Sequence, residues 1–169
     1  MPKLAVIING RPGAGKDFLC DAVVGQGRAL KVSSIDPILG IASREFGWDG
    51  IKDAKGRKLL SGLKRVSAEY NDLPNRCVLR AYEDFLQSEA EVLFVHIREE
   101  DQIEAFKAAA GNCVTLLIRR PGTDGTAGNA SDDGVEGIRY DYIFTNDKPP
   151  EQAGELFQNF IGELLSRHA

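Results

Sequence analysis

Short apolar runs alternate along the chain with longer stretches in which apolar residues recur every three or four positions. The runs are rich in β-branched residues, as buried parallel strands are, whereas the longer stretches have the period of amphipathic helices. The predicted strands are residues 4–8, 29–35, 92–97, 114–118 and 140–144. The predicted helices are residues 16–24, 37–46, 57–70, 75–88, 100–110 and 150–166.

This alternation of strand and helix predicts one α/β domain. Strand–helix–strand units place parallel strands in one sheet through right-handed crossovers, with helices on both faces. A chain of 169 residues is long enough for one substantial core and too short for a second full domain. We therefore expect a three-layer α/β/α domain that spans residues 1–169.

Two stretches interrupt the alternation and are candidates for parts near a ligand. Residues 47–56 form a turn-rich link between two predicted helices. Residues 121–137 carry five glycines, at positions 122, 125, 128, 134 and 137, with Thr, Asn, Ser and Asp between them. A structureless loop of this length is either a functional lid or a disordered segment, and the sequence does not choose between the two.

Composition narrows the class of protein. Apolar residues make up 43% of the chain and charged residues 27%, and the net charge of −4 argues against a broad interface with a nucleic-acid polymer. No apolar run approaches the roughly 20 residues that span a bilayer, and the first residues lack a signal-peptide pattern. Cys20, Cys77 and Cys113 lack CxxC spacing, which favours reduced packing residues. We expect the protein to be cytoplasmic, and the sequence does not indicate its oligomeric state.

The segment between the first strand and the first helix matches the GxxxxGK pattern, reading Gly10-Arg11-Pro12-Gly13-Ala14-Gly15-Lys16. The glycines let backbone N–H groups turn toward phosphate oxygens, and the helix N-terminus adds a favourable dipole. Lys16 supplies positive charge to the β and γ phosphates of a nucleotide. Because strand, loop, lysine and helix follow in the required order, the segment predicts a phosphate-binding P-loop rather than a chance glycine-rich turn.

Asp17 stands where the usual motif has Ser or Thr, whose hydroxyl binds Mg²⁺. A carboxylate can also hold Mg²⁺, directly or through water, although it adds negative charge beside a triphosphate. The alternative is that Asp17 only stabilises the first helical turn. We favour the role at the metal.

The segment from Gly10 to Phe18, GRPGAGKDF, resembles the GKD-type P-loop of phage and bacterial deoxynucleoside monophosphate kinases and of animal-type phosphomevalonate kinases. These enzymes belong to the nucleoside-monophosphate-kinase-like branch of P-loop proteins. Weaker similarity continues through residues 33–38, 46–50, 95–98 and 140–147. The resemblance thus spans nearly the whole chain, and the P-loop is its specific part.

The resemblance implies a P-loop fold with a five-stranded parallel sheet, an acceptor-binding helical region at about residues 37–90 and a lid at about residues 119–139. It implies an ATP- and Mg²⁺-dependent kinase that transfers the γ-phosphoryl group to a nucleoside or deoxynucleoside monophosphate. Because the P-loop resembles both groups equally, a phosphorylated non-nucleotide metabolite such as phosphomevalonate is an alternative acceptor. A further alternative is a nucleotide-binding module with weak or no transfer activity.

The resemblance also implies which residues bind ATP and the metal. Asn146 resembles the turn near the adenine ring in similar kinases, although an ordinary Asn-Asp turn would also explain it. Many relatives carry an acidic residue at the end of the third strand, whereas this strand runs Val95-His96-Ile97-Arg98, so either Asp17 or Asp36 must help organise Mg²⁺ or the metal site is weaker than the motif suggests. Asp36 could equally cap the helix that follows it. The residues expected to bind the nucleotide are Gly10, Arg11, Pro12, Gly13, Ala14, Gly15, Lys16, Asp17, Phe18 and Asn146.

Phosphoryl transfer needs positioned positive charge. Arg98 follows the third strand, on the sheet edge where open α/β sheets bind ligands, and it resembles the acceptor-phosphate clamp of the similar kinases. Arg119 and Arg120 end the fourth strand, and either could reach the transferring phosphoryl group. The predicted catalytic residues are Lys16, Arg98, Arg119 and Arg120.

Several further side chains have two interpretations. Lys64 and Arg65 could approach the acceptor, although such residues more often form a solvated helix face. His96 has apolar neighbours, which favours a strand residue with a local hydrogen bond over a general base. Residues 129–132 resemble the polar tip of related lids, with an ordinary loop as the alternative. The aromatic residues that could stack on a base or pack in the core are Trp48, Tyr70 and Tyr82.

Overall fold

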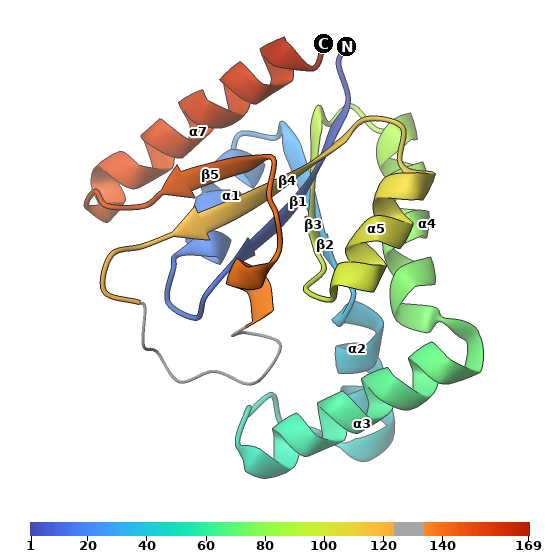
Figure 1. Ribbon diagram of the computed structural model, residues 1–169. Helices are drawn as coiled ribbons and strands as arrows, with labels where there is room; N and C mark the ends of the chain where they lie inside the picture. The colour runs from blue at the N-terminus through green and yellow to red at the C-terminus, as the bar shows by residue number, and fades with distance from the viewer. Residues whose placement is uncertain (124–133) are drawn as a thin grey trace.

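Five strands form a parallel sheet in the order β2-β3-β1-β4-β5 (Figure 1). The computed structural model describes residues 1–123 and 134–169. The central strand β1 pairs with β3 on one side and with β4 on the other. The predicted five-stranded parallel sheet is therefore confirmed. The strands are β1 (Leu4–Gly10), β2 (Ala29–Ser33), β3 (Val92–His96), β4 (Cys113–Arg119) and β5 (Tyr142–Thr145).

Helices cover both faces of the sheet, with α1 and α7 on one face and α4 and α5 on the other (Figure 1). This arrangement is the three-layer α/β/α fold that the sequence predicts. The helices are α1 (Lys16–Val24), α2 (Asp36–Phe46), α3 (Ala54–Asn71), α4 (Leu73–Gln87), α5 (Glu100–Ala109) and α7 (Pro150–Arg167), with a short 3-10 helix, η1 (Val135–Gly137).

Side chains of β1 enter two cores in turn, because successive residues of a strand point to opposite faces of the sheet. Ile8 belongs to the core under α1 and α7, which includes Phe157. Ile7 belongs to the core under α4 and α5, which includes Phe85 and Phe106. All of these side chains are fully buried. Burial on both faces explains why the strand is an uninterrupted apolar run.

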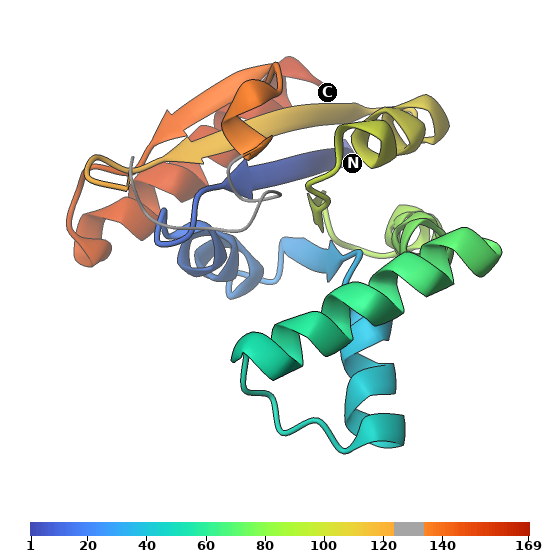
Figure 2. The same cartoon turned by 60° about the horizontal axis from the view of Figure 1, so that its bottom comes forward.

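The α2 and α3 helices leave the sheet and form an arm that projects beyond it (Figure 2). Ile38 and Leu60 belong to a small core between the two helices, and Trp48 packs against it. The next helix, α4, returns to the sheet and buries Val78 and Phe85 there. The region of about residues 37–90, expected to bind the acceptor, therefore consists of the α2–α3 arm and a helix that belongs to the sheet's outer layer.

A side-chain cap and a left-handed residue explain two helix starts that differ from the sequence prediction. The α3 helix begins at Ala54 rather than at residue 57, because Asp53 caps it and accepts a hydrogen bond from the Gly56 N–H at 2.7 Å. The α4 helix begins at Leu73, directly after α3, because Asp72 adopts a left-handed backbone with φ of 55°. That conformation ends α3 and redirects the chain within one residue.

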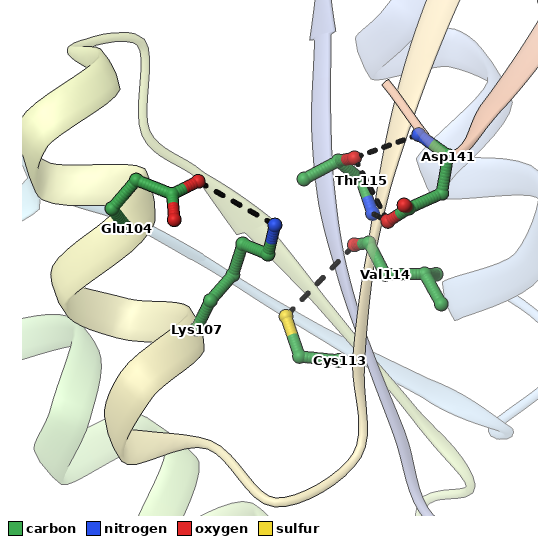
Figure 3. Close-up of polar contacts among 6 residues, drawn as sticks. All are labelled: Glu104, Lys107, Cys113, Val114, Thr115 and Asp141. Atoms are coloured by element: carbon green, nitrogen blue, oxygen red, sulfur yellow. Dashed lines mark hydrogen bonds and ion pairs between the residues drawn. The ribbon is translucent and has the colours of Figure 1, made fainter. Parts of the chain in front are cut away.

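Residues 134–141, here called the anchored segment, differ from the structureless loop expected over residues 121–137. The η1 helix lies in this segment, Val135 is fully buried, and its carbonyl accepts a hydrogen bond from the Tyr140 hydroxyl at 2.6 Å. The Asp141 carboxylate accepts hydrogen bonds from the Thr115 N–H at 2.8 Å and the Thr115 hydroxyl at 3.0 Å (Figure 3). Because these contacts precede β5, that strand begins at Tyr142 rather than at residue 140.

Two leucines of α7 test the packing of the core with the same substitution in one helix. Leu164 is 1% exposed and Leu156 is 44% exposed. We expect Leu164→Ala to lower the free energy of unfolding by about 2–5 kcal/mol, because it leaves a cavity under the sheet. Leu156→Ala should lower it by less than about 1 kcal/mol. Urea unfolding followed by circular dichroism measures both values, and equal losses would contradict this packing.

Candidate active site

The loop between β1 and α1 forms a turn at the carboxyl end of the sheet. Gly13 and Gly15 have φ of 82° and 86°, in the left-handed region that glycine adopts without strain. The Ala14 N–H donates to the Arg11 carbonyl at 3.0 Å and closes the turn. Because α1 begins at Lys16, the first N–H groups of the helix have no partner within it. This arrangement is suited to an anion.

Asn146, just after β5, holds this loop in place. Its side chain is buried, and its amide nitrogen donates to the Ala14 carbonyl at 2.9 Å. A Cβ atom on Gly15 would lie 2.5 Å from that nitrogen, so the close approach requires glycine. Asn146 also borders a cavity of about 80 Å³ with Phe18, Arg120 and other residues. The contact of Asn146 with an adenine ring remains a prediction, and its hydrogen bond to the loop is an additional role.

A cavity of about 290 Å³ lies over the loop at the end of β1. The structure places at this cavity every P-loop residue predicted from the sequence, together with Arg98 from the turn after β3. The lining residues are Gly10, Arg11, Pro12, Gly13, Ala14, Gly15, Lys16, Asp17, Phe18 and Arg98. Three cationic side chains and one carboxylate thus meet at a single opening.

The charges around Lys16 favour an anionic ligand. Burial lowers the pKa of Lys16, and the positive charges of Arg98 and Lys52 lower that pKa further, while Asp17 opposes them. A lowered lysine pKa means that the protein environment disfavours the charged ammonium group. Phosphate oxygens would reverse this effect, because they supply negative charge directly beside the ammonium group.

The two predicted metal residues lie in different surroundings. Asp17 lines the cavity, in the first turn of α1. Asp36 is exposed in the first turn of α2, and its carboxylate accepts a hydrogen bond from the Ser33 N–H at 2.8 Å. The N-cap of α2 is Ile35 and no described side chain caps this helix, so the interpretation of Asp36 as its cap is wrong. In the described ranges no three His, Cys, Asp or Glu side chains are grouped to hold a metal ion. One carboxylate still fits Mg²⁺, which keeps several waters and binds through one or two carboxylates plus substrate phosphates.

His96 ends β3 beside this cluster of charges, where many of the resembling kinases carry an acid. Burial lowers the pKa of His96 to about 4, with Lys16, Lys31 and Arg98 acting in the same direction and Asp17 opposing them. The ring is therefore neutral at pH 7. A neutral imidazole adds no negative charge that could replace the missing acid.

The two adjacent arginines after β4 lie at different places. Arg119 is exposed, and its Nε atom lies 3.9 Å from a carboxylate oxygen of Glu136. Arg120 borders the smaller cavity with Phe18 and Lys148. Neither lines the larger cavity, so their action at a transferred phosphoryl group stays a prediction.

The remaining candidate residues lie in different surroundings. The Lys64 ammonium lies 2.6 Å from the carboxylate of Glu99, next to Arg98, whereas Arg65 is exposed and pairs with Glu69 one turn along α3 at 3.6 Å. Lys64 thus contacts the residue that follows Arg98 but lines neither cavity, and Arg65 lies on a solvated face. None of the three aromatic candidates borders either cavity. Tyr82 is buried, Tyr70 is 88% exposed, and Trp48 packs against the core of the arm. The predicted lid tip at residues 129–132 lies outside the described residues.

Comparison with known proteins supports the fold independently. By sequence, the chain matches no protein-family model and no curated protein. Its structure resembles a protein from Chloroflexus aurantiacus described as a kinase, at 16% identity and a TM-score of 0.56, covering 99% of this chain and 98% of that one. It also resembles a sugar kinase from Janibacter sp. at 13% identity and a TM-score of 0.53, covering 100% and 99% of the two chains.

A third similar structure is the shikimate kinase from Acinetobacter baumannii in complex with shikimate, at 14% identity and a TM-score of 0.51, covering 99% of this chain and 95% of that one. The chain has the fold of the P-loop kinases. At such low identities the similarity establishes this P-loop kinase fold and no particular reaction. In the parts of the chain that the structure describes, no helix is both long and apolar enough to cross a bilayer.

Three charged residues of this P-loop kinase fold escaped the sequence prediction. Glu136 pairs with Arg11 and Arg119, Lys52 acts on the pKa of Lys16, and Lys148 borders the smaller cavity. Glu136 and Lys52 belong to the two stretches that interrupt the strand–helix alternation. That interruption was a signal for a site, but it does not single out residues.

The neutral state of His96 predicts a pH dependence of stability. The folded-state pKa of about 4 lies below the ordinary value of 6.5, so the unfolded chain binds more protons as the pH falls between these values. The contribution of the neutral His96 to stability is therefore fully present above about pH 6.5 and is lost as the pH falls toward 4. Between pH 7 and pH 5 the wild type should lose about 2 kcal/mol more than His96→Gln, measured by urea unfolding. Parallel losses in the two proteins would contradict the buried, neutral imidazole.

Proposed function

We propose that this protein is an ATP- and Mg²⁺-dependent phosphotransferase that moves the γ-phosphoryl group of ATP to a nucleoside or deoxynucleoside monophosphate. The observation that carries the proposal is the cavity over the P-loop, where the partly buried Lys16, with its lowered pKa, lies beside Arg98. One cation suits the donor phosphates and the other an acceptor phosphate. A site that only bound a nucleotide would not need the second.

The donor triphosphate fits the turn at the end of β1. Backbone N–H groups from the start of α1 would donate to its oxygens, and Lys16 would regain a favourable charged state. The smaller cavity continues the site around Gly15 toward Phe18, which is 49% exposed and borders both cavities. This apolar ring and the Arg120 side chain there suit the nucleoside of ATP, since aromatic and guanidinium faces both stack on bases.

The acceptor phosphate is assigned to the side of Arg98. The guanidinium group is planar and suits bidentate binding of phosphate. Next to it, the Lys64–Glu99 ion pair joins α3 to the start of α5, so the arm that carries α3 is tied to the site. The small-molecule kinases that share the fold, a sugar kinase and a shikimate kinase by their names, agree with a small acceptor.

In the proposed reaction, an oxygen of the acceptor phosphate attacks the γ-phosphorus of ATP. The bond from that phosphorus to the β–γ bridging oxygen breaks, and ADP leaves. Lys16 and Arg98 hold the two negative reactants together, and Arg119 or Arg120 stabilises the charge on the transferred group. Asp17 would hold Mg²⁺, which supplies further positive charge to the β and γ oxygens.

A phosphorylated non-nucleotide metabolite is a second candidate acceptor. The specific observation in its favour is the position of the aromatic side chains. None of Trp48, Tyr70 and Tyr82 borders either of the two cavities at the P-loop, so these aromatic residues provide no stacking platform for an acceptor base there. The same charges at Lys16 and Arg98 would serve either acceptor, because both carry a phosphate.

A panel of acceptors tests the reaction. ADP release from ATP and Mg²⁺ should rise when one of the ribo- or deoxynucleoside monophosphates, or phosphomevalonate, is added. Lys16→Ala should lower the stimulated rate at least about 100-fold while leaving the fold intact, because it removes the charge that stabilises the transferred group. Lys107→Ala, which removes a partly exposed lysine of α5 that lines neither cavity, is the matched control. Full activity of Lys16→Ala would refute the assignment.

Titration with Mg²⁺ separates the two predicted metal residues. Asp17→Asn should raise the Mg²⁺ concentration for half-maximal activity about tenfold, because it weakens the carboxylate ligand at the cavity. Asp36→Asn should leave that concentration unchanged, because Asp36 does not line the larger cavity and its carboxylate binds the Ser33 N–H instead. An unchanged titration for Asp17→Asn would leave that residue only its helix-stabilising role, and a shift for Asp36→Asn would transfer the metal to Asp36.

A further inference from the structure

The carboxylate of Glu136 lies between two arginines of the candidate active site. One of its oxygens is 3.2 Å from Nε of Arg11, in the P-loop, and the other is 3.9 Å from Nε of Arg119, at the end of β4. The Arg11 and Glu136 side chains are only 22% and 25% exposed, so the closer pair is shielded from water. A single carboxylate therefore joins Arg11, which lines the larger cavity, to Arg119, which is a candidate for stabilising the transferred phosphoryl group.

Glu136 is held in this position by the anchored segment. Val135, its neighbour in η1, is fully buried, and Tyr140 closes the segment with its hydrogen bond to the Val135 carbonyl. Asp141 fixes the far end on β4 through Thr115 (Figure 3). Because the backbone is held on both sides of Glu136, its contact with the arginines is built into the fold.

The charge of the site explains why a carboxylate is useful there. Arg11, Lys16 and Arg98 converge on one cavity, and burial together with the positive charges of Arg98 and Lys52 already lowers the pKa of Lys16. Without a ligand, a negative group reduces this repulsion. Once a triphosphate is present, the same negative group repels it and competes for the same guanidinium groups.

We propose that Glu136 is an internal anion that occupies Arg11 and Arg119 in the nucleotide-free protein and is displaced from them by the phosphates of ATP. This inference rests on the proposed function, since it assumes that ATP binds the P-loop. It assigns Glu136 a role in binding rather than in chemistry. The carboxylate sets a threshold that only a ligand with several negative charges overcomes, so the site discriminates ATP from AMP.

Calorimetric binding of ATP, ADP and AMP in the presence of EDTA tests this role. Glu136→Gln keeps the size and an accepting oxygen of the side chain but removes its charge. The variant should bind ATP roughly fivefold more tightly than the wild type, with smaller gains for ADP and AMP. Its melting temperature without ligand should fall, because two ion pairs are lost. The matched control is Glu163→Gln on α7, which removes an exposed carboxylate paired with Arg167 and should change neither quantity.

A background that lacks both arginines distinguishes displacement from a general effect of charge. In the double variant Arg11→Gln Arg119→Gln, the added Glu136→Gln substitution should change ATP affinity less than about twofold, because no arginine remains to be released from Glu136. A persistent fivefold gain would overturn the inference. If the wild type binds ATP but Glu136→Gln binds it equally or more weakly, the role of Glu136 would be overturned and the proposed function would stand. A wild type that does not bind ATP would overturn the proposed function as well.

Discussion

The hydrogen bond from the Asn146 amide to the Ala14 carbonyl is the contact on which the site depends. It joins the loop after β5 to the loop after β1, two segments that only the completed sheet brings together. Gly15 can pass so close to Asn146 because it has no Cβ atom, and its left-handed backbone turns the chain into α1. The sheet thus holds the P-loop in place through Asn146, and the glycines of the loop allow its turn.

Concentrated positive charge is the second constraint on this site. Burial, together with the approach of Arg98, disfavours the charged ammonium of Lys16, and burial together with nearby positive charges keeps His96 neutral. Such a site favours an anionic ligand, because negative charge would offset the burial and the mutual repulsion of its cations. Asp17 opposes the lowering of the Lys16 pKa, and Glu136 pairs with Arg11 and Arg119. Asp17 would hold a metal ion together with a bound nucleotide, whereas Glu136 would be displaced by the phosphates of that nucleotide.

Much of the fold was predictable because buried parallel strands leave an unmistakable apolar pattern. The bounds of α1 agree with the prediction, since glycine precedes it and its apolar residues keep helical spacing. The P-loop was also evident, because the glycines and the lysine that such a loop needs lie within one short stretch of the sequence. Contacts distant in sequence were not predictable. Glu136 and Asp141 act through Arg11, Arg119 and Thr115, and nothing near them in the chain indicates those partners.

Phosphorus-31 NMR of ATP, Mg²⁺ and the acceptor panel with the wild-type protein tests the central claim most directly, because it follows the γ-phosphorus itself. Transfer to a phosphate-bearing acceptor predicts that the γ resonance of ATP declines while ADP and a new phosphoanhydride resonance of the acceptor grow in equal amounts. Loss of the γ resonance to inorganic phosphate alone, or its persistence with every acceptor, would contradict a phosphotransferase of this kind.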